Sequence, residues 1–372
     1  MIAHPPVAEI VVDLDAIRAN LRRLTAAAEG AAVMAVVKAD GYGHGMVEVA
    51  RAAREAGVPW LGAATPDEAR ALRAAGDTGR LLCWLGGPDE QYVDLVAADV
   101  DVTAHSPDQV RAVAAAARQA GQTARLQLKV DTGLSRGGAG RDLWPALIEA
   151  AAGAPEVQVT GVWSHLACAD EPDHPANAEQ VRVFCEALAM VEQAGLEPEV
   201  RHLANSAGTL FLPSTRFDLV RCGIATYGLS PAPGVASSAE LGLTPAMTVR
   251  GRLLVAKDIP AGAGVSYGHT FVAPDDMRVG LVPMGYGDGI PRSASRRAEV
   301  QLGGRRSALL GTVCMDQFVV AAPDGEVGDE VVLFGTGRDG EPTADDWARW
   351  CETINYEIVT RIGGRQQRTY TG

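Results

Sequence analysis

A lysine at position 38 stands between an apolar run and a glycine-rich segment. The run Val33–Val37 is typical of a buried strand, and Gly41, Gly43 and Gly45 follow it closely. Partial burial lowers the pKa of a lysine amine, and such an amine can form a Schiff base with a carbonyl compound. The glycines permit a tight turn and a close approach of the backbone to a ligand. These residues favour a carbonyl-binding lysine over the alternative, a lysine that reaches solvent ahead of a flexible loop.

Other polar or glycine-containing segments also come at or just past the ends of apolar runs. They are Lys129, Asp131, Arg136, His165, Asn205–Gly208 and Gly223–Ile224. A serine hydroxyl and the backbone N–H groups beside glycines are suitable donors for a phosphate group. A Schiff-base lysine together with a phosphate cradle indicates pyridoxal phosphate (PLP), an aldehyde cofactor that needs both anchors.

Arg221 lies at the end of a further apolar run and indicates how strongly the ring of such a cofactor would withdraw electrons. PLP enzymes adjust their chemistry through the protein group beside the pyridine nitrogen of the cofactor. An aspartate would keep that nitrogen protonated, whereas an arginine cannot accept its proton. An arginine therefore weakens the ring as an electron sink, which suits a short-lived carbanion.

Alternating strand-like and helix-like segments between residues 31 and 227 must position these side chains. Eight short apolar runs have the length of buried strands: Val33–Lys38, Trp60–Ala64, Arg80–Leu85, Val100–Ala104, Arg125–Asp131, Val157–His165, Val200–Ala204 and Phe217–Arg221. Two helices begin with an N-cap hydroxyl and a proline in the first turn, at Thr65-Pro66 and Ser106-Pro107. Eight such units in about 200 residues predict an α/β fold, a (β/α)8 TIM-type barrel with its chemistry at the C-terminal strand ends. The competing doubly wound sheet is disfavoured because no G-x-G-x-x-G motif follows the first strand.

The sequence changes character after Ser230, where a segment rich in proline, glycine and serine is typical of a crossing between domains. Five β-type runs follow: Met247–Ala256, Arg278–Pro283, Ala298–Leu302, Ser307–Val320 and Glu330–Phe334. A tight hairpin is predicted at Leu302–Arg305, and helices are predicted only at Thr343–Cys351 and Asn355–Ile362. We therefore expect a PLP-binding barrel at residues 10–235 and a mostly β domain at residues 236–372. The strand within residues 1–13 is a candidate partner of the second domain.

The composition indicates which partners and which cellular compartment to expect for this protein. The 372 residues are 47% hydrophobic, and the formal net charge of -13 includes no block of like charges. An acidic chain of this kind predicts no nucleic-acid partner, and the lack of a long apolar run predicts no association with membrane. The N-terminus lacks the features of a signal peptide, and six scattered cysteines indicate reduced thiols. A cytoplasmic protein without a metal site is therefore expected.

Seven motifs, in order along the chain, resemble those of the alanine racemase family. They are V-V-K-A-D-G-Y-G-H-G at Val36, K-V-D-T-G-L-S-R at Lys129, H-L-A-N-S-A at His202, V-R-C-G-I at Val220, S-Y-G-H-T at Ser266, G-Y-G-D-G at Gly285 and V-C-M-D-Q at Val313. The resemblance covers nearly the whole chain from Glu9 onward. It implies a PLP-dependent isomerase that interconverts L- and D-alanine for peptidoglycan synthesis, and a homodimer with shared active sites.

The resemblance also implies two bases and a set of cofactor contacts. Lys38 would hold PLP and act as the base on one face of the substrate, and Tyr267 of the partner subunit would act on the opposite face. His202 would support Arg221 beside the pyridine nitrogen. The cofactor contacts would be Lys38, Tyr42, Arg136, His165, Asn205, Ser206, Arg221, Gly223, Ile224 and Tyr356.

Further residues would serve the substrate in this family. Arg136 would help to hold the substrate carboxylate, together with Met315 and Asp316 of the partner subunit. Lys129 matches a lysine that is often carbamylated and would steady Arg136. The substrate entry channel would be lined by Tyr286, Arg292, Ile354 and Tyr356.

The sequence departs from the family pattern at the serine and the final glycine of V-D-T-G-L-S-R-G-G and, more tellingly, at Thr312. Thr312 stands where many members have an arginine in the outer part of the channel, which bears on substrate entry and selectivity rather than on the reaction. A racemase of broader specificity, acting on serine or other small amino acids, is therefore the first alternative. A PLP-dependent decarboxylase would need a carboxylate near the pyridine nitrogen, and a Schiff-base aldolase would lack the phosphate cradle.

Overall fold

The computed structural model describes residues 6–372, which divide by their contacts into two compact units. The first, called here the barrel unit, comprises Arg18–Gly41 and Met46–Leu243. The second, the sheet unit, comprises the described residues up to Ile17, the segment Tyr42–Gly45 and Thr244–Gly372. The limits 10–235 and 236–372 stay predictions, and residues 1–5 of the expected N-terminal segment lie outside the described residues.

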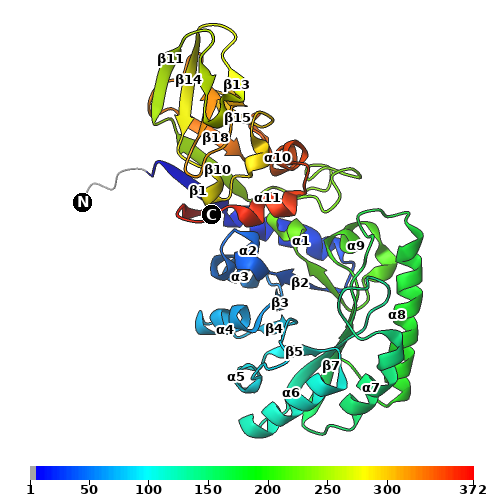
Figure 1. Cartoon of the computed structure of the whole chain (residues 1–372). Helices are drawn as coiled ribbons and strands as arrows, with labels where there is room; N and C mark the ends of the chain where they lie inside the picture. Colours follow the sequence, from blue (N-terminus) through cyan, green and yellow to red (C-terminus); the bar gives the residue numbers. More distant parts are fainter. Residues whose placement is uncertain (1–5) are drawn as a thin grey trace. The chain divides into compact units, whose positions relative to one another are not determined.

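Eight parallel strands form the sheet of the barrel unit, as the sequence predicts (Figure 1). They are β2 (Ala32–Val36), β3 (Trp60–Ala63), β4 (Arg80–Cys83), β5 (Asp101–Ala104), β6 (Ala124–Lys129), β7 (Val157–Trp163), β8 (Val200–His202) and β9 (Leu219–Cys222). Their order in the sheet is β8-β7-β6-β5-β4-β3-β2-β9. The edge strands also approach each other, since Asp218 N–H donates to Arg201 O and Arg221 N–H donates to Ala204 O, both at 3.0 Å. The sheet is therefore a nearly closed barrel, and the doubly wound alternative is wrong.

Helices follow most of these strands and cover the outside of the barrel. They are α3 (Met46–Glu55), α4 (Pro66–Ala74), α5 (Val93–Ala97), α6 (Pro107–Ala120), α7 (Trp144–Ala152), α8 (Pro175–Gln193) and α9 (Ser206–Phe211). Both predicted N-caps are confirmed, because Thr65 Oγ1 accepts the Glu68 N–H and Ser106 Oγ accepts the Gln109 N–H, each at 3.3 Å. These caps place the beginnings of α4 and α6 close after the ends of β3 and β5.

The sheet unit is mostly β, as predicted, and one nine-stranded sheet dominates it. Its order is β11-β14-β17-β16-β15-β18-β10-β1-β19, and β12 and β13 form a separate pair. The strands are β1 (Ala8–Asp13), β10 (Met247–Arg252), β11 (Val255–Ile259), β12 (Gly264–Val265), β13 (Phe271–Val272), β14 (Met277–Val282), β15 (Glu299–Leu302), β16 (Arg305–Leu310), β17 (Phe318–Ala321), β18 (Glu330–Phe334) and β19 (Gln367–Thr371). The predicted hairpin is confirmed, because Gly303 and Gly304 join β15 to β16 with positive φ angles. The early strand β1 pairs with β10 and β19.

The two helices predicted near the C-terminus are also confirmed. They are α10 (Ala344–Cys351) and α11 (Asn355–Arg361). The helix α1 (Leu14–Ala27) begins directly after β1, and in the segment labelled α2 (Lys38–Tyr42) residues 39–42 have a left-handed backbone. It follows the first strand of the barrel and carries the predicted reactive lysine.

One predicted strand is wrong in its extent. The run Ser307–Val320 is divided into β16 and β17 by a loop that carries Met315 and Asp316. Gly311 begins this loop with φ 68°, and a Cβ at that position would lie 2.6 Å from Val265 O. The backbone therefore turns out of the strand at a position that only glycine can occupy.

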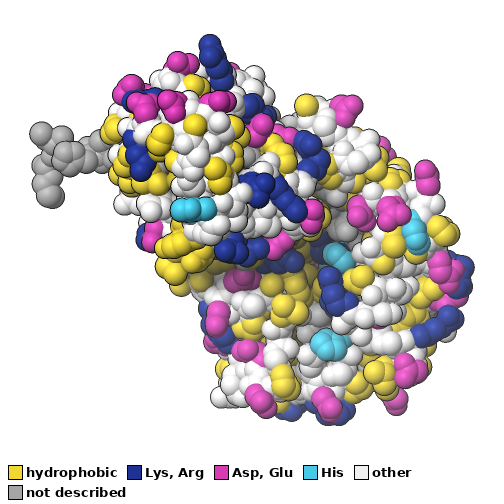
Figure 2. Space-filling view, turned by 45° about the horizontal axis from the view of Figure 1, so that its top comes forward, with side chains coloured by type: hydrophobic (Ala, Val, Ile, Leu, Met, Phe, Trp, Pro, Cys, Tyr) yellow, Lys and Arg dark blue, Asp and Glu magenta, His cyan; other side chains and the backbone are white. Residues whose placement is uncertain are grey.

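Charged side chains are mixed over the surface. On the face shown in Figure 2, acidic and basic side chains are interspersed. This matches the sequence, which has no block of like charges. Among residues 6–372, none of the helices combines the length and apolar character that crossing a membrane requires.

Candidate active site

Lys38 lies two residues past the end of β2, at the C-terminal strand ends of the barrel. The preceding Val37 is fully buried, and the Lys38 side chain is half-buried with its Nζ 5.8 Å from the centre of the Trp84 ring. Burial, followed by the positive charge of Arg136, lowers the pKa of Lys38 from 10.5, and Glu68 partly opposes this change. A larger share of the amine is therefore neutral, which is the form that acts as a nucleophile or a base.

The backbone after Lys38 is strained. Residues 39–42 all have φ between 52° and 63°, although only one of them is glycine. This left-handed conformation costs about 1–2 kcal/mol per non-glycine residue. Glu68 holds the turn, because its Oε1 accepts the Ala39 N–H at 2.7 Å while its Oε2 accepts the Thr65 N–H at 3.1 Å. The first turn of α4 thus fixes the direction in which the chain leaves Lys38.

Lys129 ends β6, and Arg136 lies exposed in the loop that follows. Lys129 Nζ lies 4.4 Å from the centre of the Trp163 ring, at the end of β7. Burial, and then the positive charge of Arg221, lowers the pKa of Lys129 from 10.5 to about 8. The Asp131 carboxylate accepts backbone N–H groups of its own loop, so its role is to shape that loop.

Arg221, on β9, is buried among neutral groups. Its Nη1 donates to His202 Nδ1 at 3.0 Å and to His202 O at 3.2 Å. Its Nη2 donates to His165 Nδ1 at 3.1 Å and to the carbonyl oxygens of Ser164 at 2.7 Å and Leu203 at 3.2 Å. Burial lowers the pKa of Arg221 to about 9, and burial together with Arg221 holds the pKa of both imidazoles well below 6.5. The guanidinium thus has five acceptors, and no carboxylate within residues 6–372 is bonded to it.

The loops after β8 and β9 are joined by Ser206. Its Oγ accepts the N–H of Gly223 at 2.9 Å and the N–H of Ala225 at 3.4 Å. Because this oxygen already accepts two protons, its own hydroxyl proton is directed to another acceptor. The Asn205 side chain caps α9, since its Oδ1 accepts the Gly208 N–H at 2.9 Å. Ser206 therefore joins the two loops in which the sequence predicts a phosphate cradle.

Two predicted tyrosines lie together in the sheet unit. The ring centres of Tyr42 and Tyr356 are 6.3 Å apart. Burial raises the pKa of Tyr42, so its hydroxyl stays protonated and can donate. The neighbouring Gly43 is required by packing, because a Cβ there would lie 2.3 Å from Val359 O in α11.

Tyr267, in the same unit, is 74% exposed. The preceding Ser266 has φ 61° and ψ -171°, a backbone region that is nearly confined to glycine. Ser266 Oγ donates to Thr312 O at 2.7 Å, and Thr312 Oγ1 donates to Tyr267 O at 3.2 Å. The hydrogen bonds of Thr312 therefore hold the backbone beside the exposed tyrosine.

The loop between β16 and β17 presents two further predicted residues. Met315 and Asp316 are exposed, and Asp316 is ion-paired with Arg365 at 2.5 Å. Tyr286 is also exposed, and its N–H donates to Cys314 O at 3.0 Å, which ties its turn to this loop. The turn that carries Tyr286 and the loop that carries Met315 and Asp316 are thus hydrogen-bonded to each other in the sheet unit.

The predicted residues fall into two groups. The strand ends of the barrel unit carry Lys38, Lys129, Arg136, His165, His202, Asn205, Ser206, Arg221, Gly223 and Ile224. The sheet unit carries Tyr42, Tyr267, Tyr286, Arg292, Met315, Asp316, Ile354 and Tyr356. Their individual roles stay predictions.

Sequence reasoning missed several residues that shape this site. Glu68 is not among the predicted residues, although it holds the turn after Lys38. Trp163 stacks on His202 with ring centres 5.7 Å apart and an angle of 8°. Gln127 accepts a hydrogen bond from His202, and a polar side chain inside an apolar strand was the signal that could have identified it.

Comparisons with known proteins agree with this arrangement. The family models described as "Alanine racemase, N-terminal domain" and "Alanine racemase, C-terminal domain" match residues 12–231 and 246–370. The alanine racemase of Salinispora arenicola is 54% identical over 371 residues, which is 98% of each chain. That of Frankia casuarinae is 53% identical over 365 residues, 97% of this chain and 95% of the relative.

A solved structure shows the same likeness in three dimensions. The crystal structure of alanine racemase from D-cycloserine producing Streptomyces lavendulae has a TM-score of 0.98 and 52% sequence identity. The match covers 100% of this chain and 98% of that one. This chain therefore belongs to the alanine racemase family.

Proposed function

We propose that this protein is an alanine racemase that uses PLP to interconvert L-alanine and D-alanine. The observation that carries the proposal lies at one end of the barrel. There, a lysine with a lowered pKa accompanies a buried arginine whose partners are all neutral. Membership of the family over both halves of the chain supports the same reaction.

The side chains at the barrel end fit PLP in three respects. Lys38 offers a partly neutral amine for covalent attachment of the cofactor aldehyde. Ser206 Oγ, which accepts two N–H groups, has its own proton to donate to a phosphate. Arg221 would meet the pyridine nitrogen without accepting a proton from it. The other proposed contacts are Tyr42, Arg136, His165, Asn205, Gly223, Ile224 and Tyr356.

The proposed mechanism uses Lys38 as the base on one face of the substrate. When bound, PLP supplies an electron-withdrawing ring that acidifies the Cα proton of an attached amino acid. Lys38 Nζ would remove or return that proton, and its lowered pKa keeps a neutral share of the amine near neutral pH. Arg221, with neutral His202 and His165, would limit the charge that the ring takes up, which favours rapid return of the proton.

The second base is Tyr267 of the partner subunit in a homodimer. A phenol with an unperturbed pKa of about 10 needs nearby cations or donors to act as a base, and we place His165 in that role. Support comes from Tyr267 itself, which is 74% exposed and follows a strained residue, as a group that serves another molecule would. Met315 and Asp316 of the same partner would hold the substrate carboxylate together with Arg136.

A racemase of broader specificity is the second candidate. Thr312 favours it, because a short hydroxyl side chain stands beside the backbone of Tyr267 where many relatives have an arginine. A decarboxylase is disfavoured, because the acceptors bonded to Arg221 are imidazoles and carbonyls rather than a carboxylate.

The cellular role that we propose is supply of D-alanine for peptidoglycan in the cytoplasm. Six cysteines that are all unpaired support a reducing compartment. Mixed surface charge, as in Figure 2, supports small-molecule chemistry without a nucleic-acid or membrane partner.

The direct test is formation of the opposite enantiomer. The purified protein is incubated with PLP and either L-alanine or L-serine, and the D-isomers are measured by chiral chromatography. We expect D-alanine to form much faster than D-serine, and comparable rates would favour the broader racemase. Release of carbon dioxide without any D-isomer would overturn the proposal in favour of a decarboxylase.

A further inference from the structure

A chain of polar side chains runs through the interior of the barrel to the candidate site. Gln127 Nε2 donates to Asp101 Oδ1 at 3.2 Å, and Gln127 Oε1 lies 2.8 Å from His202 Nε2. His202 Nδ1 accepts a hydrogen bond from Arg221, which also donates to His165 Nδ1. Asp101, Gln127 and His202 have no exposed surface. This series of hydrogen-bonded side chains therefore links the N-terminal strand ends to the C-terminal strand ends, and its first three residues have no contact with solvent.

The direction of each hydrogen bond in this chain is fixed by chemistry. The Asp101 carboxylate can only accept, so the amide nitrogen of Gln127 faces it and the amide oxygen faces His202. His202 Nε2 must therefore carry a proton. Arg221 can only donate, so His202 Nδ1 must be bare. His202 is thus held as the neutral Nε2–H tautomer, in agreement with a pKa held well below 6.5 by burial and by Arg221.

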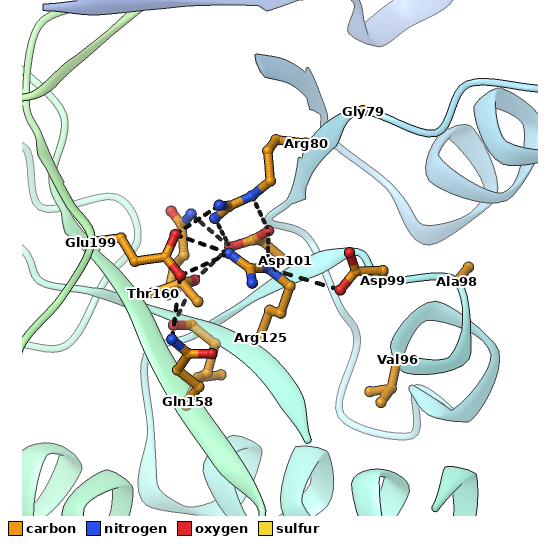
Figure 3. A network of polar contacts seen from close by, with 12 residues as sticks. Gly79, Arg80, Val96, Ala98, Asp99, Asp101, Arg125, Gln158, Thr160 and Glu199 are labelled. Carbon is orange, nitrogen blue, oxygen red and sulfur yellow. Dashed lines mark hydrogen bonds and ion pairs between the residues drawn. The ribbon is translucent and has the colours of Figure 1, made fainter. Parts of the chain in front are cut away.

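The far end of the chain is anchored by an ion cluster, drawn in Figure 3. Arg125 Nε donates to Asp101 at 3.0 Å, Arg80 Nη2 donates to it at 3.2 Å, and the Thr160 hydroxyl also donates to it. Glu199 bonds to both arginines from the other side. Asp101 is therefore surrounded by donors and cannot reverse its role in the chain.

The Gln127 amide is also closely packed, and glycine at position 161 leaves the space that it occupies. A Cβ at Gly161, on the neighbouring strand β7, would lie 2.8 Å from Gln127 Cδ and 2.9 Å from Gln127 Oε1. Stacking of Trp163 on the His202 ring fixes the plane of that ring, but stacking alone does not select which nitrogen bears the proton. The position of the proton is therefore set by the two hydrogen-bond partners of the ring, Gln127 at Nε2 and Arg221 at Nδ1.

We propose that Gln127, oriented by Asp101, is a positioning residue for the racemase reaction. Together with Arg221 it sets the His202 tautomer, because it accepts the Nε2 proton and leaves Nδ1 to accept from Arg221, and it thereby keeps the guanidinium in the orientation that the site uses. If the Gln127 amide turned over, His202 would present an N–H to the N–H of Arg221, and the guanidinium would lose one of its five acceptors. This inference deepens the proposed function and rests on it for the effect on catalysis, although the tautomer itself does not depend on it.

The first test is Gln127→Met, which keeps the length of the side chain and removes both its donor and its acceptor. Gln158→Met is the matched control, because Gln158 lies at the same end of the barrel and bonds only to exposed Glu199 at 3.3 Å. The protein without substrate is labelled with ¹⁵N-histidine, and the His202 signal is assigned as the one lost in His202→Gln. We expect one protonated and one bare nitrogen in the wild type and in Gln158→Met, with a slowly exchanging imidazole proton that is lost in Gln127→Met.

Catalysis supplies the second readout. We expect kcat/KM of Gln127→Met to fall about 10-fold, the equivalent of one hydrogen bond to a charged group, with an altered pH dependence of the lysine-bound PLP absorbance. If Gln127→Met fails to fold, Gly161→Ala displaces the same amide without changing a donor or an acceptor, and a smaller change in the same direction is expected.

The outcomes separate this inference from the proposed function. An unchanged His202 spectrum and unchanged kcat/KM in both Gln127→Met and Gly161→Ala would overturn the inference while leaving the racemase intact. A wild-type protein that forms no D-alanine but shows the expected tautomer would instead refute the proposed function and leave the role of Gln127 in selecting the tautomer standing.

Discussion

The two ends of the barrel hold similar arginines in opposite surroundings. At the N-terminal strand ends, Arg125 bonds to the carboxylates of Asp101 and Glu199, each at 3.0 Å (Figure 3). Burial alone would lower the pKa of Arg125, but these carboxylates raise it overall. At the C-terminal strand ends, Arg221 meets only imidazoles and carbonyls, and burial lowers its pKa to about 9. One end is neutralised within the protein, and the other keeps uncompensated positive charge.

This difference separates a stabilising region from a binding region. Lys38 and Lys129 also have lowered pKa values, because burial and neighbouring cations act on both. Glu68 and Asp131 offset these positive charges only in part. Cations gathered with too few internal anions destabilise the protein on its own, and a bound anion such as a phosphate or a carboxylate relieves this. We therefore propose that the C-terminal strand ends bind a ligand, whereas ion pairs at the opposite end stabilise the fold.

The largest expected effect is at the binding end. We expect Lys38→Ala to abolish the yellow absorbance of lysine-bound PLP and to reduce racemisation by about 10⁴-fold or more, since a general base alone contributes 10²–10⁴-fold. Absorbance after borohydride reduction and D-alanine formation are measured together. Lys257→Ala, which alters an exposed lysine, is the control. Retention of the borohydride-fixed cofactor on another lysine would contradict the role of Lys38.

The next effect is at the stabilising end. Asp101→Asn removes the charge of a side chain with no exposed surface that is bonded to two arginines. We expect a loss of about 3 kcal/mol in the free energy of unfolding in urea, because both arginines are left with one partner fewer. Glu179→Gln breaks an exposed pair with Arg182 and should leave stability unchanged. Equal stability of the two variants would remove the contrast between the ends.

A smaller effect concerns the pH at which Lys129 reacts. Its folded pKa of about 8 lies below the ordinary 10.5, so the folded protein has lost a proton that the unfolded chain still holds between these pH values. This group therefore adds stability as the pH rises through that window. We expect acylation of Lys129 in the cofactor-free protein to reach half its maximal rate near pH 8, as followed by mass spectrometry of the tryptic peptide. A midpoint near 10.5 would show that neither burial nor the neighbouring cations lower the pKa of Lys129.

Much of the architecture follows from local signals in the sequence. The eight barrel strands are short apolar runs, the Thr65 and Ser106 caps are set by neighbouring residues, and the Gly303–Gly304 turn has a single favoured geometry. Lys38 and Arg221 could be predicted as site residues because charged groups are costly at the ends of buried strands.

The features that escaped prediction depend on residues far apart in the chain. Asp101 and Gln127 are 26 positions apart, and although each is a polar residue in an apolar strand, the sequence does not reveal that the two are partners. The break at Gly311 depends on the close approach of Val265, which no local pattern reveals. Family resemblance supplied roles for Tyr267 and its neighbours, but an exposed tyrosine has no distinctive signal of its own.

The central claim is that each site combines Lys38 of one subunit with Tyr267 of the other. Lys38→Ala and Tyr267→Phe proteins, each inactive alone, are co-expressed with different affinity tags so that the mixed dimer can be isolated. The mixed dimer has one site with both bases intact, so we predict that D-alanine formation from L-alanine returns in it. A mixed dimer as inactive as either parent, measured by chiral chromatography, would contradict the account.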